Sequence, residues 1–194
     1  MAVIVGVAIG AQSARPPEPE LTPPPAATAT ATRPTATATP SESTQEPRPV
    51  GDVVASGIRY GTEERVFYFI PVDVPRQPHV TIGLVAGRRS ADGKLTSDFV
   101  ANDVEGNDRR PGFHQIGYDQ PGPIPTSPPV PTFGYFVGPA ERIVGTVEGR
   151  KVTARLATWS RDPQVVIFWF DPEQLKPGVP LDSILARDAH GRKL

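Results

Sequence analysis

Proline sets the first constraint on what this chain can fold into. Ten of its 25 prolines lie between Arg15 and Pro49, in a stretch that has no aromatic residue and only Leu21 as a large aliphatic residue. Such a segment buries too little apolar surface to offset the conformational entropy lost on ordering. We therefore predict a disordered Pro/Thr/Ala-rich spacer over residues 15–50 and a single folded domain over residues 51–194.

The residues before the spacer are apolar. Residues 1–11 carry no charged side chain, and Ser13 and Ala14 follow with small side chains. Eleven residues are too short to cross a bilayer as a helix, but they match the apolar core of a secretory signal peptide. The basic residues that usually precede such a core are absent from the sequence. Residues 1–14 are thus interpreted as an apolar leader, either a signal peptide or a truncated membrane segment.

A proline-rich spacer favours extended polyproline II, so 35 residues would reach on the order of 100 Å. The combination of an apolar leader, a Thr/Pro stalk and a small β domain resembles the plan of many envelope proteins of Gram-positive bacteria with high-GC genomes. The resemblance implies an extracytoplasmic protein, secreted or membrane-anchored, in the bacterial cell envelope. Contact with the membrane is expected only through the N-terminal segment.

From residue 53 onward the dominant hydrophobic period is two, and long helical patterns are absent. Nine strand-like runs are separated by turn residues such as Glu148-Gly149 and residues 160–163. The runs span residues 53–60, 65–72, 79–85, 95–101, 133–137, 142–147, 152–159, 165–170 and 183–187. Two runs, VFYFI and VVIFWF, are apolar on both faces and are expected at the centre of the fold. The pattern predicts an all-β fold, a single Ig-like β-sandwich of eight or nine strands.

Charge and motif content exclude several functional classes. From Gly51 onward, 17 basic residues balance 17 acidic ones, so nothing predicts binding to nucleic acid. The absence of cysteine excludes a thiol nucleophile, a disulfide and a Cys-based zinc site. No nucleophile elbow, Gly-rich phosphate loop or H-E-x-x-H motif occurs. We expect no cofactor, no catalytic residue and no enzymatic activity, although a triad assembled only in space stays open.

One segment lacks a strand pattern, over residues 105–132, and is longer than most connections in compact domains. Two interpretations stay open: a binding surface, because long loops often carry function, or a proline-stiffened crossover between two sheets. The candidate ligand-binding residues in it are Arg109, Arg110, Phe113, His114 and Tyr118. His114 is also the best placed of the three histidines for a catalytic base.

Oxygen-bearing side chains gather around the start of this segment. The candidate ligands of a calcium ion are Asp103, Glu105, Asn107 and Asp108. Counted from Asp103, however, glycine falls at the fourth position and His114 at the twelfth, where an EF-hand requires glycine at the sixth and glutamate at the twelfth. Turn residues with Asx-type hydrogen bonds are the favoured interpretation, and calcium is the alternative.

Aromatic residues cluster at positions 67–69, 133–136 and 168–170, with Trp159 apart. Their alternation favours a role in the core, while an exposed row of rings that stacks on sugars is the alternative. We accordingly expect a non-catalytic extracytoplasmic domain that presents residues 105–132 to a protein or a cell-wall polymer. A carbohydrate-binding module or an unrecognised cell-wall hydrolase is the alternative function.

Overall fold

The computed structural model describes residues 48–119 and 127–194, and within these ranges the chain forms eleven β-strands and no helix. The first sheet has four antiparallel strands in sequence order: β1 (Val50–Tyr60), β2 (Glu63–Pro71), β3 (Ile82–Arg89) and β4 (Leu95–Ala101). The second sheet has the order β5 (Gly112–Phe113), β6 (Phe133–Val137), β10 (Asp162–Trp169) and β9 (Arg155–Trp159). The third has the order β11 (Ser183–Arg187), β7 (Arg142–Val147) and β8 (Arg150–Thr153). The all-β prediction is confirmed, with eleven strands instead of eight or nine.

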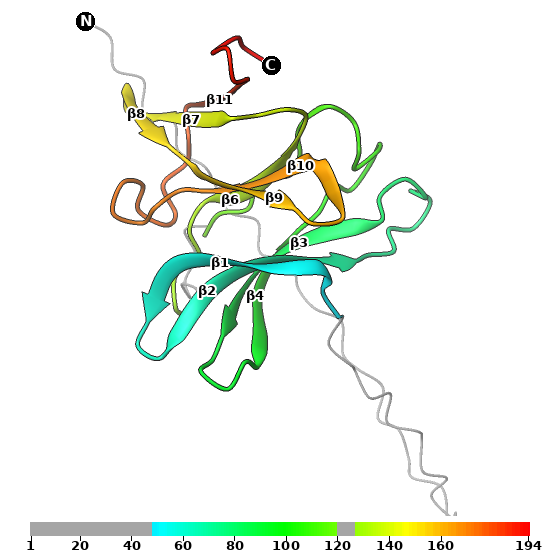
Figure 1. Cartoon of the computed structure of the whole chain (residues 1–194), viewed down its shortest axis with the longest axis vertical. Helices are drawn as coiled ribbons and strands as arrows, with labels where there is room; N and C mark the ends of the chain where they lie inside the picture. Colours follow the sequence, from blue (N-terminus) through cyan, green and yellow to red (C-terminus); the bar gives the residue numbers. More distant parts are fainter. Residues whose placement is uncertain (1–47, 120–126) are drawn as a thin grey trace, which may run out of the picture. The chain divides into compact units, whose positions relative to one another are not determined.

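The three sheets form layers, with the second sheet in the middle (Figure 1). A first apolar cluster combines Phe67 and Leu84 of the first sheet with Tyr135 and Ile167 of the second. A second cluster combines residues of the second and third sheets, for example Phe168 and Ile143. The middle sheet is therefore covered by apolar side chains on both faces.

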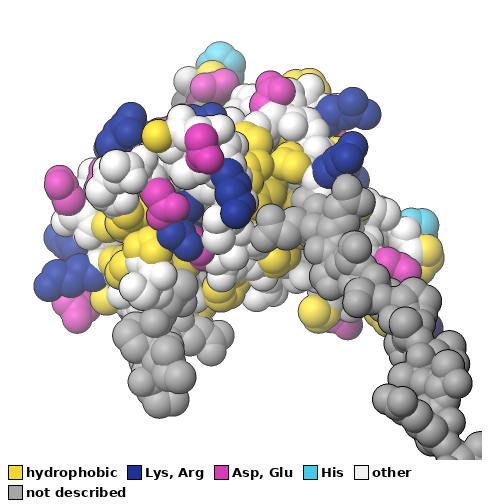
Figure 2. Space-filling view, turned by 90° about the horizontal axis from the view of Figure 1, so that it is seen from below, with side chains coloured by type: hydrophobic (Ala, Val, Ile, Leu, Met, Phe, Trp, Pro, Cys, Tyr) yellow, Lys and Arg dark blue, Asp and Glu magenta, His cyan; other side chains and the backbone are white. Residues whose placement is uncertain are grey.

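Period-two alternation explains why two strands are apolar throughout. In β10, Ile167 and Trp169 belong to the first cluster, whereas Phe168 between them belongs to the second. In β2, Phe67 joins the first cluster and Tyr68 joins a third cluster on the opposite face of the first sheet. Figure 2 views the molecule from the side of the first sheet and shows hydrophobic side chains among charged ones. The prediction that these two strands are covered on both faces is confirmed.

Tight turns connect several neighbouring strands at the predicted positions. Glu148-Gly149 joins β7 and β8, and both residues have positive φ, 49° and 74°, as a type I′ hairpin requires. Between β9 and β10, Trp159 pairs with Asp162 across a two-residue turn. Asp162 itself begins the strand, so the turn is shorter than the predicted residues 160–163.

Several strand predictions differ from the structure. Residues 152–159 form two strands in different sheets, because the chain leaves the third sheet at Ala154, whose small side chain is buried in the second cluster. The alternation of side chains continues across this crossing, so the sequence pattern does not reveal where one strand ends and the next begins. β5 lies within the segment that was expected to have no strand. β3 begins at Ile82 and extends to Arg89, because its charged end pairs with acidic neighbours.

The predicted leader, residues 1–14, and most of the predicted spacer, residues 15–47, lie outside the described residues. Val50, assigned to the end of the spacer, is the first residue of β1 and pairs with Phe69. Across the described ranges, no helix has the length and apolarity needed to cross a membrane.

Candidate functional site

The first half of the long segment is fastened to the sheets by Asp108. This side chain is 2% exposed, and its carboxylate accepts hydrogen bonds from the backbone N–H groups of Thr81 (2.5 Å) and Ile82 (3.0 Å). The Thr81 hydroxyl donates to the same oxygen at 2.9 Å. Asp108 therefore satisfies the backbone donors at the start of β3, a structural role that leaves this oxygen fully used.

His114 is a second fastening point. Its ring stacks on Tyr135, with 4.5 Å between the ring centroids and 3° between the planes. Nδ1 lies 2.5 Å from the Asp103 carboxylate and Nε2 lies 2.7 Å from the Arg110 carbonyl oxygen. Because a carbonyl can only accept, Nε2 donates to it, while Nδ1 faces the Asp103 carboxylate. Both ring nitrogens are engaged, so neither is free to act as a catalytic base.

The phenol of Tyr135 is buried away from solvent in this region. Burial raises the pKa of Tyr135, and the nearby carboxylates of Asp103 and Asp108 raise it further. The neutral hydroxyl donates to the Asp108 carbonyl oxygen at 3.3 Å.

The structure does not bring the five predicted ligand-binding residues together. Arg109 lies over the ring of Trp159, 4.8 Å from its centroid. Phe113 packs into the second apolar cluster, whereas His114 faces Tyr135. Arg110 is exposed and Tyr118 is half-buried. Phe113 and His114 thus face two different layers of the core, while Arg110 lies at the surface.

Three of the four candidate calcium ligands are also directed at the protein. Besides His114, Asp103 accepts the backbone N–H of Gln115 at 3.1 Å. Asn107 accepts the N–H of Arg109 at 2.8 Å, which confirms an Asx turn at this position. Glu105 is exposed. Within residues 48–119 and 127–194, no three His, Cys, Asp or Glu side chains are grouped so that they could hold a metal ion. The calcium site stays a prediction.

The surface is hollowed elsewhere, by a groove of about 500 Å³ between the end of β1, the start of β9 and the loop after β10. We call it the proline groove. It is lined by Gly57, Ile58, Arg59, Tyr60, Pro129, Arg155, Asp171, Pro172, Glu173 and Pro177. One tyrosine and three prolines give it rigid apolar walls, and two cations and two anions give it charges of both signs. Pro129 is the contribution of the long segment.

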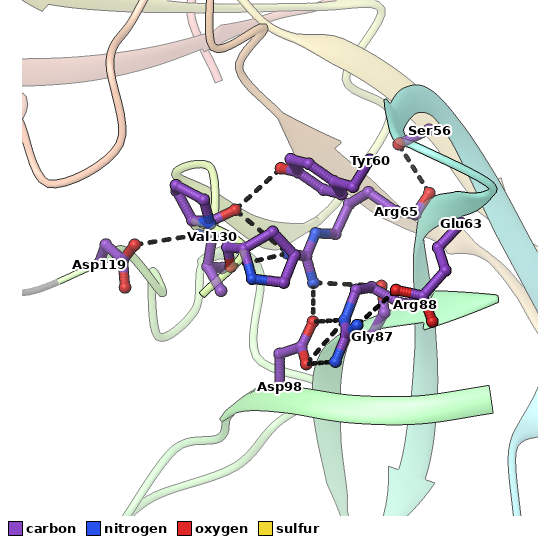
Figure 3. Close-up of polar contacts among 11 residues, drawn as sticks. Ser56, Tyr60, Glu63, Arg65, Gly87, Arg88, Asp98, Asp119 and Val130 are labelled. Atoms are coloured by element: carbon purple, nitrogen blue, oxygen red, sulfur yellow. Dashed lines mark hydrogen bonds and ion pairs between the residues drawn. The ribbon is translucent and has the colours of Figure 1, made fainter. Parts of the chain in front are cut away.

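Pro129 is held in place by Arg65, a side chain of 0% exposure (Figure 3). Arg65 Nη2 donates to the Pro129 carbonyl oxygen at 3.1 Å and lies 3.4 Å from that of Pro128. The Tyr60 hydroxyl donates to the same Pro129 oxygen at 2.8 Å, and its ring lies 5.1 Å from the Arg65 guanidinium carbon. We call these contacts of Arg65 and Tyr60 the arginine clamp.

The charge of Arg65 is balanced inside the sheet. Its Nη1 lies 2.5 Å from the carboxylate of Asp98, which is also bonded by Arg88 Nε at 2.9 Å. Arg88 in turn pairs with Glu63 at 2.5 Å, so the network contains two cations and two anions. The hydrogen bond to Asp98 raises the pKa of Arg88, with Glu63 adding to the increase. Arg65 and Asp98 are the buried members of this network, so removing Arg65 would leave it with one excess negative charge.

The other side of the loop end is closed by Asp119. Its carboxylate accepts the backbone N–H of Val130 at 3.0 Å (Figure 3). Residues 119 and 130 are thereby joined, with the clamped prolines immediately before Val130. One wall of the proline groove therefore has a backbone that is hydrogen-bonded on both sides, by Arg65 at Pro129 and by Asp119 at Val130.

The sequence analysis did not select Tyr60 or Arg65. A usable signal was present, because period two places Arg65 on the same face of β2 as Phe67 and Phe69, which predicts a buried arginine. A buried arginine requires acceptors and a counter-charge. The sequence does not tell which acceptors these are.

Both tryptophans lie in the core, with Trp159 3% and Trp169 4% exposed. The three aromatic clusters are likewise buried, which confirms their interpretation as core. Tyr60 and Tyr118 are the partly exposed tyrosines of the described chain. An exposed row of tryptophan rings for sugar stacking is therefore excluded.

Compared with known proteins, the chain matches no family model, no curated protein sequence and no solved structure.

Proposed function

We propose that this chain is a non-catalytic binding module of the bacterial cell envelope, and that its proline groove holds an extended segment of a protein partner. The arginine clamp carries the proposal. A wholly buried guanidinium donates to the backbone of a proline loop that forms a groove wall. Burying a charge is costly unless it is paired, as Arg65 is with Asp98, and the result here is a groove wall fixed before any ligand arrives. Preorganisation of this kind reduces the entropy lost on binding.

The chemistry of the groove favours an extended peptide. Proline-rich segments dock into grooves lined by aromatic rings, and Tyr60 supplies such a ring here. Arg155 and Asp171, paired at 2.6 Å, lie in the wall, while Arg59 and Glu173 are exposed beside them. Charges of both signs favour a mixed polypeptide over a strongly charged polymer.

A cell-wall sugar is the second candidate, because Tyr60 is a partly exposed ring in the groove and a sugar face stacks on such rings. It has less support, since both tryptophans are buried. The hydrolase alternative has no support from His114, whose two ring nitrogens are engaged.

We further propose that the first and second sheets form the Ig-like sandwich expected from the sequence. Their shared apolar cluster supports this arrangement. The third sheet is an addition to it, packed on the outer face of the second. The extracytoplasmic location is inferred from the composition of residues 1–47, as leader and spacer.

The test is a comparison of two ligands on the full chain. Binding to an array of short proline-containing peptides is measured beside sedimentation with purified cell wall. We expect peptides to bind, Tyr60→Ala to weaken them about tenfold or more, and Arg59→Ala to weaken them less. The matched control is Arg192→Ala, an exposed arginine of the C-terminal turn.

Wall material that sediments the chain in a Tyr60-dependent manner, without peptide binding, would establish the sugar alternative instead. Failure to bind either ligand, or peptide binding that Tyr60→Ala and Arg59→Ala leave unchanged, would overturn the proposed groove.

A further inference from the structure

The outer face of the first sheet, turned away from the second sheet, carries the third apolar cluster. The members of this cluster belong to β1–β4 or follow β2 directly, whereas the first two clusters each combine residues of two sheets. An antiparallel sheet that faces solvent usually presents polar side chains there, and a large apolar face marks an interaction surface. The outer face of the first sheet is therefore a candidate docking surface.

This face is hollowed by a depression of about 390 Å³. Lys94, in the turn between β3 and β4, is exposed, and Leu95 next to it is half-buried, so a docking segment can reach both side chains. We call the depression the Lys94 hollow, and its lining includes Arg48, Pro49, Tyr68, Val85, Lys94 and Leu95. None of its lining residues belongs to the proline groove, so it is independent of the function proposed above.

The position of Arg48 and Pro49 favours a segment of the same chain as the occupant. They are the first residues that the structure describes, and the sequence before them is Thr44-Gln45-Glu46-Pro47. A segment joined to the edge of a site by a short link acts at an effective concentration in the millimolar range, so weak contacts are enough to hold it. The residue before a proline favours an extended backbone, which lowers the entropy lost when Glu46 and Arg48 are ordered.

Charge complementarity points to the same segment. Of the described residues that line the hollow, only Arg48 and Lys94 are charged, and both are cations. Glu46 is the one charged residue among residues 44–47. Four extended residues reach about 13 Å, so Glu46 is within reach of the hollow that Arg48 lines. The Pro47 ring offers an apolar surface for Leu95.

We propose that residues 44–47 dock in the Lys94 hollow of their own chain, with the Glu46 carboxylate paired with the Lys94 ammonium and the Pro47 ring packed on Leu95. Docking covers part of the apolar outer face of the first sheet. It also moves the point at which the spacer leaves the domain from Pro49 to Thr44. The spacer expected over residues 15–50 is thereby shortened to residues 15–43.

The experiment is a measurement of backbone NMR order parameters on the isotope-labelled full chain. We expect values of about 0.8 for the amides of Gln45 and Glu46, as for the strands, and values below about 0.6 for Thr37 further along the spacer. Lys94→Glu replaces attraction by repulsion, so the values of Gln45 and Glu46 should fall toward that of Thr37. The matched control is Lys151→Glu, at an exposed lysine of β8, which should leave them unchanged.

A charge swap makes the test specific. The double variant Glu46→Lys, Lys94→Glu should recover the order that Lys94→Glu removes, and a dispersed amide spectrum verifies that each variant folds. Order parameters at Gln45 and Glu46 as low as at Thr37 in the wild type would overturn the proposal. So would ordering that Lys94→Glu leaves intact, or a swap that restores none of it. Ordering that disappears on dilution would show that a second copy of the chain covers the face instead.

Discussion

The two ends of the long segment are fastened to the sheets by opposite chemistry. At its start, the carboxylate of Asp108 accepts from the backbone N–H groups of Thr81 and Ile82. At its end, Arg65 and Tyr60 donate to the backbone carbonyl of Pro129. Proline has a carbonyl but no N–H, so the proline residues of this loop end can be hydrogen-bonded only by donors. Each fastening side chain is therefore of the type that its backbone partner requires: an acceptor where N–H groups are free, and donors where a carbonyl is free.

The comparison also explains why an arginine is present at this position. The two terminal nitrogens of its planar group, Nη1 and Nη2, reach the Gly87 carbonyl, Asp98 and the Pro129 carbonyl in different directions. A carboxylate could not bind the proline carbonyls, and a lysine ammonium would reach fewer of these partners. The groove wall is therefore linked directly to the charge network of the first sheet.

The largest expected effect is that of Arg65→Met, which removes the donor at the proline end. Asp98 keeps Arg88, but one negative charge in the network loses its partner and the Pro129 carbonyl loses a donor. We expect the free energy of unfolding to fall by about 3–5 kcal/mol, measured by urea denaturation. A loss below about 1 kcal/mol, as for an exposed ion pair, would contradict a buried clamp.

At the other end, Asp108→Asn keeps the shape but replaces a charged acceptor by a neutral amide. We expect a smaller loss, of about 2–3 kcal/mol, because one amide oxygen can still accept from Thr81 or Ile82. The matched control is Asp119→Asn, where a single N–H is at stake and about 1 kcal/mol is expected. A reversed order of the two losses would contradict the role given to Asp108.

The carboxylate end should also be sensitive to alkaline pH. Folding raises the pKa of Tyr135 above the ordinary value of 10.0, so its contribution to stability is complete below pH 10 and is lost as the pH rises toward the folded value. Melting temperature should therefore decline between about pH 10 and 11.5, and less steeply in Tyr135→Phe. Tyr118→Phe, at a half-buried position, is the control. Equal slopes for both variants would show that Tyr135 is not responsible.

The last prediction is that removing calcium has no effect on stability. Because Asp103 and Asp108 already accept protein donors, a calcium chelator should leave the melting temperature unchanged. Calcium-dependent stabilisation that Glu105→Gln abolishes would establish the site that the sequence left as an alternative.

The sequence predicted the features that depend on neighbouring residues, but not those that depend on contacts between residues far apart in the chain. Alternation within VFYFI and VVIFWF is local, and it correctly predicted two strands covered on both faces. The crossing at Ala154 could not be predicted, because the same alternation continues from one sheet into the next. The clamp could not be predicted either, since Arg65 and Pro129 are 64 positions apart and meet only in the folded chain.

The central claim, that the clamp fixes the groove wall in advance, is tested most directly by amide hydrogen exchange in Arg65→Lys. Val130 is the first residue after the clamped prolines with an N–H, so its amide reports opening of this loop end. The account predicts that exchange at Val130 accelerates about tenfold or more, while the amide of Ile167 in β10 stays as protected as in the wild type. Unchanged protection at Val130, or an equal loss at Val130 and Ile167, would contradict it.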